Sequence, residues 1–285
     1  MAERRTDPAP RRAAPSPLIA ASVAGHALAG IAWIVRPRIW PVALAAVVAD
    51  QLLLVGAGLW PRSSLLGPNW TRLPATPALQ GRIAITIDDG PDPRVTPAVL
   101  SILDRFGVAA TFFCIGERVE RHRDLAREIV RRGHAIENHS YRHSHAFSLL
   151  GAGAQHADIA RAQECIADAA GVAPRFFRAP AGLRNPLLQP VLARLGLQLA
   201  SWSRRGYDTV THDPGKVLQR LTRSLRGGEI LLLHDGHAAR TAAGTAVAVE
   251  ILPPLLEALR ERQLVPITLR SALTAQRCGQ VRKPG

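Results

Sequence analysis

The stretch "AITIDDGPDP", Ala84 to Pro93, joins an apolar run to two adjacent aspartates and a Gly-Pro turn. The apolar run predicts a buried strand that ends at Asp88 and Asp89. Consecutive side chains of a strand point in different directions, so the two carboxylates can serve two separate tasks. A nearby cation would relieve their mutual repulsion. The pair therefore indicates a candidate site at the end of this strand, although a turn followed by a helix cap also fits it.

Short apolar segments alternate with longer amphipathic segments from residue 82 onward. Seven segments predict strands, namely 83–87, 110–116, 135–140, 175–179, 197–203, 229–234 and 264–269. The stretches between them carry apolar residues at helical spacing. This alternation predicts parallel strands connected by crossover helices, in either an α/β barrel or a doubly wound sheet.

A second polar motif, "ENHSYRH", ends the third predicted strand. Its His139 and His143 are spaced i, i+4, which places both imidazoles on one side of a helical turn. One aspartate and two histidines form a reasonable set of protein ligands for Zn²⁺ or a similar divalent ion, with a position left for water. Such an ion lowers the pKa of bound water toward about 7, and a neighbouring carboxylate can take the proton. Taken alone, the two histidines also fit a solvated helix face.

The N-terminal part of the chain has a different composition. Segments 18–35 and 39–60 are apolar and long enough to cross a bilayer, and only the short "RPR" separates them. Trp33, Trp40 and Trp60 lie near the segment ends, where indole rings favour the membrane interface. We predict a transmembrane hairpin, with a cleaved signal peptide as the alternative for the first segment.

Arginines around the two segments predict the orientation. Four arginines precede the first segment, and Arg62 and Arg72 follow the second, whereas Arg36 and Arg38 lie between the two. This bias favours both outer flanks inside the cell. The C-terminal domain would then face the cytoplasm at the bacterial inner membrane. If only one segment spans, that domain would face the periplasm.

Composition sets further limits on the chain. Its 285 residues are 47% hydrophobic, enough for one large core, and its net charge of +14 comes almost wholly from arginine. No basic run with interleaved aromatics is present, so we expect no nucleic-acid partner. Three cysteines without metal-type spacing argue against a disulfide framework. The expected parts are a basic tail (1–17), the hairpin (18–60), a linker (61–81), a catalytic domain (82–272) and a disordered tail (273–285).

Five separated blocks resemble the polysaccharide deacetylases with the chitooligosaccharide deacetylase homology domain, over roughly residues 82–270. The blocks are "TIDDGPDP", "HSYRH", "FRAP", "RGYDT" and "LLLHD". The resemblance implies an irregular (β/α) barrel of about seven parallel strands. It also implies hydrolysis of the N-acetyl group of an amino sugar with one divalent metal ion, for which zinc is favoured and Co²⁺, Ni²⁺ or Fe²⁺ remain open.

The resemblance also implies roles for the residues that hold the metal and activate water. Asp88 takes the place of the general base, and Arg178 takes that of the arginine that orients it. The metal ligands would be Asp89, His139 and His143.

Further roles follow for the residues that handle the substrate. His234 would be the general acid, tuned by Asp208. Ala181, after Pro180, would offer its backbone N–H to the oxyanion, and Leu232 would line the acetyl pocket.

The chain departs from the family pattern in two blocks. Ala181 stands where the family commonly has tyrosine or phenylalanine, and the D-x-x-D-W block becomes "RGYDT". Arg205 replaces the first acid and Thr209 replaces the tryptophan, whereas Asp208 keeps the second acid. A guanidinium group suits phosphate or carboxylate better than the face of a neutral sugar.

Together with the hairpin, these departures predict a lipid-linked acetamido sugar, such as a polyprenyl-phosphate N-acetylhexosamine, in envelope or lipopolysaccharide modification. Arg205, with Arg204 and Arg184, would lie near the phosphate. The expected partners are this substrate and membrane lipids. Three alternatives remain: a deacetylase of a soluble or cell-wall polysaccharide, a hydrolase of formyl groups or cyclic amides, and a non-catalytic sugar-binding or scaffold protein.

Overall fold

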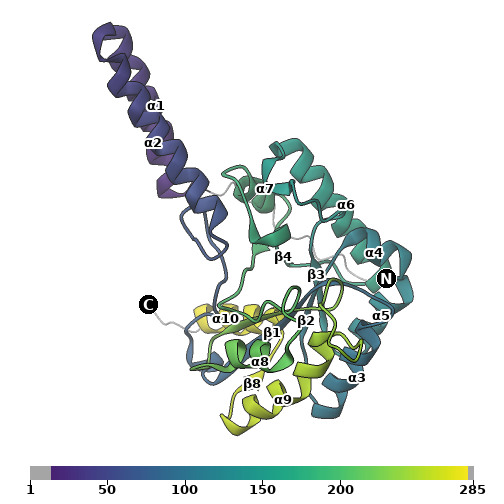
Figure 1. Cartoon of the computed structure of the whole chain (residues 1–285). Helices are drawn as coiled ribbons and strands as arrows, with labels where there is room; N and C mark the ends of the chain where they lie inside the picture. Colours follow the sequence, from purple (N-terminus) through teal and green to yellow (C-terminus); the bar gives the residue numbers. More distant parts are fainter. Residues whose placement is uncertain (1–13, 282–285) are drawn as a thin grey trace.

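The computed structural model describes residues 14–281, so most of the predicted basic tail and the last four residues lie outside the described part. Two long helices, α1 (Pro17–Val35) and α2 (Trp40–Leu59), project from an α/β domain (Figure 1). A short 3-10 turn, Pro37–Ile39, connects them. The two parts match the division between residues 18–60 and the remainder that the sequence indicates.

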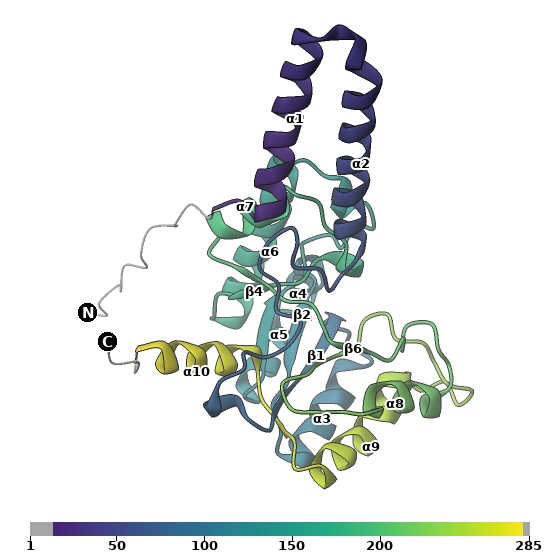
Figure 2. The ribbon, with the colours of Figure 1, turned by 90° about the vertical axis from the view of Figure 1, so that its left-hand side faces the viewer.

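The two helices run side by side as a hairpin (Figure 2). The Ser16 hydroxyl caps α1 by accepting a hydrogen bond from the backbone N–H of Ile19. Large apolar side chains on the pair point outward, with Ile34 78% and Val42 70% exposed. Both helices are long and apolar enough to cross a membrane by length and composition. An exposed apolar surface of this size is typical of a segment that contacts lipid or another apolar partner.

The domain is a curled half-barrel of parallel strands, which confirms the predicted (β/α) barrel. The strand order is β5-β4-β3-β2-β1-β7-β6, and β8 pairs with the start of β1. The strands are β1 (Arg82–Gly90), β2 (Thr111–Cys114), β3 (Ala135–Asn138), β4 (Phe176–Phe177), β5 (Gln198–Leu199), β6 (Arg204–Arg205), β7 (Ile230–His234) and β8 (Val265–Pro266). Each of the seven predicted segments overlaps one of these strands, and β6 is an addition.

Helices cover the outside of the sheet, with one exception. They are α3 (Thr96–Phe106), α4 (Gly116–Arg121), α5 (Arg123–Arg131), α6 (Ala152–Ala170), α7 (Leu188–Arg194), α8 (Pro214–Thr222), α9 (Val247–Glu261) and α10 (Leu269–Val281). The exception is α10, which packs in a cluster with the inward-facing Ala84, Phe113 and Leu232. The main core lies between the central strands and the helices α3 and α9, with Ile85, Phe112, Leu231, Leu100 and Leu255 all fully buried. Burial of these side chains holds β1, β2 and β7 in place, and the site is built on their ends.

Residues 61–81, the predicted linker, lie along the open side of the half-barrel. The backbone N–H of Trp70 donates to the Leu199 carbonyl, and the Trp70 carbonyl accepts from the N–H of Ser201, both at 2.9 Å. Arg72 forms an ion pair with the buried Glu229 at 3.0 Å. These contacts hold this segment against β5 and the start of β7.

The helix α10 corrects one prediction. Residues 273–281 belong to this helix, whereas the sequence predicts a disordered tail from residue 273. Leu269, Ala272 and Leu273 are buried and pack in one cluster with Leu79. The apolar spacing of these residues continues the helix past the predicted boundary, so the prediction of disorder was wrong for this stretch.

Candidate active site

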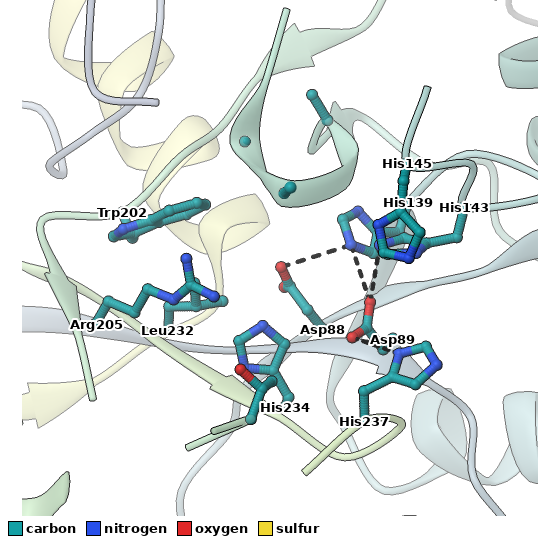
Figure 3. A pocket seen from close by; sticks show the side chains of 14 residues that line it. Asp88, Asp89, His139, His143, His145, Trp202, Arg205, Leu232, His234 and His237 are labelled. Carbon is teal, nitrogen blue, oxygen red and sulfur yellow. Dashed lines mark hydrogen bonds and ion pairs between the residues drawn. The ribbon is translucent and has the colours of Figure 1, made fainter. Parts of the chain in front are cut away.

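Polar side chains from several strands meet at the carboxyl-terminal rim of the half-barrel. Asp88 and Asp89 end β1, His139 follows β3, and His234 ends β7. They line one cavity of about 220 Å³ (Figure 3). In barrels of parallel strands this rim is the place where sites are built.

A local irregularity of β1 turns both carboxylates toward the cavity. The register with β2 shifts between Asp88 and Gly90, so Asp89 is an extra residue in the strand, as in a β-bulge. Asp89 has a φ of 73°, in the left-handed region. Such backbone strain in a non-glycine residue is concentrated at functional sites.

His139 and His143 converge as predicted, but on a loop and not on a helical turn. Ser140 and His143 both have left-handed backbone conformations, with φ of 64° and 51°. The Ser140 hydroxyl accepts a hydrogen bond from the backbone N–H of His143 at 2.9 Å. This tight turn brings the second imidazole back beside the first, with 4.7 Å between ring centroids.

Three side chains form a cluster suited to a divalent cation. The Nε2 atoms of His139 and His143 each lie 3.2 Å from Oδ1 of Asp89, and the three ligand atoms lie within 4.8 Å of one another. This Asp89 Oδ1 is buried and has no hydrogen-bond partner among the described residues. Two imidazole nitrogens and one carboxylate oxygen are a common set of protein ligands for zinc and related ions.

The hydrogen bonds and pKa shifts of His139 and His143 fit a site for a divalent cation. Nδ1 of His139 donates to the Arg178 carbonyl at 2.8 Å, so Nε2 is the atom that faces Asp89. Burial lowers the pKa of His139, but the charge of Asp88 and the contacts of Asp89 outweigh burial and raise it overall, so this position attracts positive charge. Burial lowers the pKa of His143 to about 3, which keeps that imidazole neutral and able to bind a metal. The residues present therefore fit the expected divalent ion.

A third histidine, His237, contacts the same carboxylate and has no predicted role. Its Nδ1 lies 2.9 Å from Oδ2 of Asp89, and its Nε2 lies 3.1 Å from a guanidinium nitrogen of Arg118. Arginine only donates hydrogen bonds, so Nε2 accepts and Nδ1 carries the proton that is donated to Asp89. His237 thus fixes the carboxylate with its other oxygen toward His139 and His143.

Asp88 is held by a buried arginine. Nη1 of Arg178 lies 2.6 Å from Oδ1 of Asp88, and Arg178 is only 1% exposed. The remaining guanidinium donors bond Thr86 and the carbonyls of Ala200 and Ser201. Asp88 Oδ2 stays on the cavity side, 3.7 Å from His139 Nε2. The structure therefore brings the predicted base and its orienting arginine together.

His234 and Asp208 form a second buried pair across the cavity. Nδ1 of His234 lies 2.9 Å from Oδ1 of Asp208, and the backbone N–H of His234 donates to Oδ2 at 2.7 Å. Burial lowers the pKa of His234, but the charge and hydrogen bond of Asp208, together with the charges of Asp88 and Asp89, outweigh burial and raise the pKa to about 9. The imidazole is therefore protonated at neutral pH. Because Nδ1 bonds Asp208, Nε2 is left to face the cavity.

The remaining wall residues differ in how they meet the cavity. Leu232, Ala181 and Arg205 line it, whereas Pro180 starts a short turn, Pro180–Gly182, and is buried without being part of the lining. Trp202, which the sequence does not single out, supplies an indole to the wall. This ring partly replaces the aromatic side chains that the chain lacks at its two departures from the family pattern.

Of the three arginines predicted near a phosphate, only Arg205 meets the cavity. Arg204 forms an ion pair with Glu229 at 2.5 Å, and the buried Arg184 donates to the Ser63 carbonyl beneath the hairpin. A buried carboxylate and a backbone carbonyl thus already engage Arg204 and Arg184, which their proximity to Arg205 in the sequence does not reveal.

Known proteins resemble this chain in both sequence and structure. Residues 76–200 match the polysaccharide deacetylase family. A chitooligosaccharide deacetylase of Azorhizobium caulinodans is 34% identical over 190 residues, which are 64% of this chain and 90% of that protein. A peptidoglycan-N-acetylglucosamine deacetylase of Bacillus cereus is 34% identical over 175 residues, which are 61% of this chain and 81% of that protein.

A solved structure agrees with these matches. The family 4 carbohydrate esterase of Streptomyces lividans, determined in complex with acetate, superposes with a TM-score of 0.60 at 31% identity. The alignment covers 65% of this chain and 91% of the esterase. The half-barrel and its rim define a hydrolase of the carbohydrate-esterase kind. The chain belongs to the polysaccharide deacetylase family.

Proposed function

We propose that this protein is a metal-dependent deacetylase that hydrolyses the N-acetyl group of an acetamido sugar. The observation that carries the proposal is the meeting, at one cavity, of a histidine–aspartate cluster with two buried pairs, Asp88–Arg178 and Asp208–His234. The pairs supply a base and an acid, which amide hydrolysis requires. The deacetylase relatives support this choice of reaction.

One chemical contribution would come from the ion. Held by Asp89, His139 and His143, a divalent cation, for which zinc is our proposal, would polarise the acetyl carbonyl and lower the pKa of a water.

The side chains of the protein perform the proton transfers. Arg178 holds Oδ1 of Asp88, so Oδ2 accepts the proton of the attacking water. The backbone N–H of Ala181, at the cavity wall, donates to the developing oxyanion. His234 then gives its Nε2 proton to the leaving nitrogen, which departs as a free amine beside acetate.

The cavity suits a small acyl group. Leu232 is 1% exposed and Trp202 is 7% exposed, and both line it with apolar surface. At about 220 Å³ the cavity accommodates an acetyl group and part of one sugar, while a longer substrate would extend beyond its mouth.

The finer part of the proposal is the carrier of the sugar. The exposed apolar helices α1 and α2 support insertion in a membrane, and the arginine bias supports a cytoplasmic face for the domain. At the exit of α2, the Pro61 carbonyl accepts a hydrogen bond from the Ser201 hydroxyl at 2.8 Å, and the Gly58 carbonyl accepts one from the N–H of Arg184 at 3.2 Å, which holds this exit beside the rim. We therefore propose a lipid-linked acetamido sugar as the substrate, in modification of the bacterial envelope.

Mass spectrometry of the product tests both parts. Membranes that contain the full chain are supplied with polyprenyl-phosphate N-acetylhexosamine or with soluble chitooligosaccharide, and Asp88→Asn is the control. Replacement of one acetyl group by hydrogen on the lipid substrate alone supports the whole proposal. The same change on the soluble oligomer alone still supports a deacetylase, but one that acts on a cell-wall or free polysaccharide and not on a lipid-linked sugar. Activity on neither, with metal bound, contradicts the deacetylase and directs the search to formyl and cyclic amide substrates.

A further inference from the structure

A second hollow, here called the basic cavity, adjoins the catalytic pocket. It has a volume of about 420 Å³ and shares Trp202 and Arg205 with the catalytic pocket. Its other walls include Trp60 and Arg62 at the exit of α2, and Arg220 on α8. The basic cavity therefore lies between the catalytic pocket and the membrane-facing helices.

The charge of the basic cavity is uncompensated. Its lining contains four arginines and no acidic residue. Arg204 is neutralised by Glu229, but within the described residues Arg62, Arg205 and Arg220 lie within ion-pair distance of no carboxylate. Three like charges around one hollow repel one another unless an anion enters it.

The free donors of these arginines are available to a ligand. The buried Nε of Arg205 has no hydrogen-bond partner in the part of the chain that the structure describes. Arg62 makes only a long contact, 3.4 Å, with the Ser203 carbonyl. Arg220 uses one nitrogen, Nη1, to bond Gly206 and Thr211, and this leaves its other donors free.

Aromatic rings orient two of the guanidinium groups. Arg205 lies 5.0 Å from the ring centroid of Tyr207 and 5.6 Å from that of Trp202, and Arg220 lies 5.6 Å from Tyr207. A cation–π contact does not use the N–H groups of the guanidinium, so these donors remain available for phosphate oxygens.

The position of the basic cavity indicates the source of the anion. Trp60 follows the last residue of α2 and is 55% exposed, as expected for an indole at the level of lipid headgroups. A phosphate that links a sugar to a membrane lipid lies at this same level. We propose that the basic cavity binds the phosphate of the lipid-linked substrate while the acetamido group occupies the catalytic pocket. This inference rests on the proposed function.

Matched substrates distinguish the contribution of the phosphate to substrate recognition from that of the lipid. The full chain, in zwitterionic phosphatidylcholine nanodiscs, is assayed for acetate release from N-acetylglucosamine and N-acetylgalactosamine joined to citronellol through a phosphodiester. The neutral counterparts join the same sugars to citronellol directly, and methyl phosphodiesters keep the phosphate without the lipid. The variants are Arg62→Gln and Arg220→Gln, and the control is Arg226→Gln, which removes an equal charge from an exposed position outside the basic cavity.

Loss of one charge-assisted hydrogen bond predicts a fall of roughly tenfold in the ratio of kcat/KM for phosphodiester over neutral substrate. We expect this fall in both basic-cavity variants, for the citronellyl and the methyl phosphodiester alike, and none in Arg226→Gln. A ratio that is the same in wild type and variants overturns the proposal. A fall seen with the citronellyl compound alone also overturns it, because the arginines would then respond to lipid and not to phosphate.

A binding measurement keeps this proposal separate from the proposed function. Citronellyl phosphate, which carries no sugar, is titrated while the fluorescence of the tryptophans is followed. Binding that Arg62→Gln weakens about tenfold, without acetate release from any substrate, would support the basic cavity and contradict the deacetylase. Acetate release with no binding of citronellyl phosphate would keep the deacetylase and reject the phosphate site.

Discussion

Replacement of Asp208 by asparagine tests how His234, the proposed general acid, is kept protonated. Asp208 is fully buried and contacts both Nδ1 and the backbone N–H of His234. Asparagine preserves the size of the side chain and removes its charge. We expect the variant to fold and bind metal, and to lose activity first at alkaline pH.

The magnitude follows from the pKa of His234. Burial lowers this pKa, and the charge and hydrogen bond of Asp208, with smaller contributions from the charges of Asp88 and Asp89, raise it to about 9. Without that charge the pKa returns toward its ordinary value of about 6.5. At pH 8 the protonated fraction then falls from about 90% to about 3%, roughly a thirtyfold loss of the acid form. Because the protonated form is active, kcat is retained below the pKa and lost as pH rises through it.

The assay is a pH profile of kcat for acetate release by the metal-loaded chain. The alkaline limb should move down by about two pH units in Asp208→Asn. Asp168→Asn, at an exposed position on α6, should leave the profile unchanged. The free energy of unfolding, measured against pH, should agree. Because the pKa of His234 is raised in the folded state, its protonation stabilises the fold most below about pH 6.5, and this contribution disappears as pH rises through about 9.

An unchanged alkaline limb in Asp208→Asn, with metal still bound, would refute the reasoning. An unchanged limb could arise because groups other than Asp208 set the pKa of His234, or because His234 does not control the limb. Direct titration of the His234 ring by NMR, with its signal assigned by loss in His234→Gln, separates these two explanations. A pKa that stays near 9 in the variant would assign the shift to groups other than Asp208.

Three other substitutions test separate contacts. Arg178→Lys should keep the positive charge but lose the guanidinium hydrogen bonds to the Ala200 and Ser201 carbonyls that fix it beside Asp88, so we expect kcat to fall at least tenfold with metal content unchanged; full activity would contradict an orienting role. His237→Ala should weaken metal binding about tenfold in a competitive chelator titration. His237→Asn, which keeps a donor near Nδ1, should bind nearly as wild type, and equal losses in both would reject the hydrogen bond to the ligand carboxylate. Leu273→Ala should lower the free energy of unfolding by about 2 to 3 kcal/mol in urea, with Thr274→Ala near neutral; no difference would mean that α10 contributes nothing there.

The barrel is predictable because its pattern is local. Most of the predicted strands are rich in apolar residues and lie between amphipathic stretches, as burial on both faces requires. The strand β6 escapes prediction because it consists of Arg204 and Arg205 alone, and only pairing with β7 identifies it. The helix α10 shows the reverse case, because the sequence predicts disorder from residue 273, whereas Leu273 is buried within this helix.

The site is predictable to the extent that its residues occur in spaced motifs. The motifs identify His139 and His143, but not the left-handed turn that makes them converge. His237, Arg118 and Trp202 carry no signal in the sequence, because their roles arise from contacts between segments far apart in the chain. Contacts of that kind depend on the fold and not on any local pattern.

The electrostatic state of each arginine is equally hidden in the sequence. Arg204 and Arg205 are adjacent, yet one is neutralised by Glu229 and the other lies at the junction of two cavities. The alternation of side chains along a strand explains this difference, since neighbours face opposite sides.

The most direct test of the account is a metal titration that follows acetate release. The full chain is stripped with a chelator, its metal content is measured, and zinc is returned in steps to wild type and to His143→Ala. We predict that acetate release from the proposed acetamido-sugar substrate is absent without metal. It should rise in proportion to zinc and reach a plateau at one ion per chain. The His143→Ala variant should require far more zinc. Acetate release that persists in the stripped chain, or that is the same in both proteins, would contradict the metal site on which the proposed function depends.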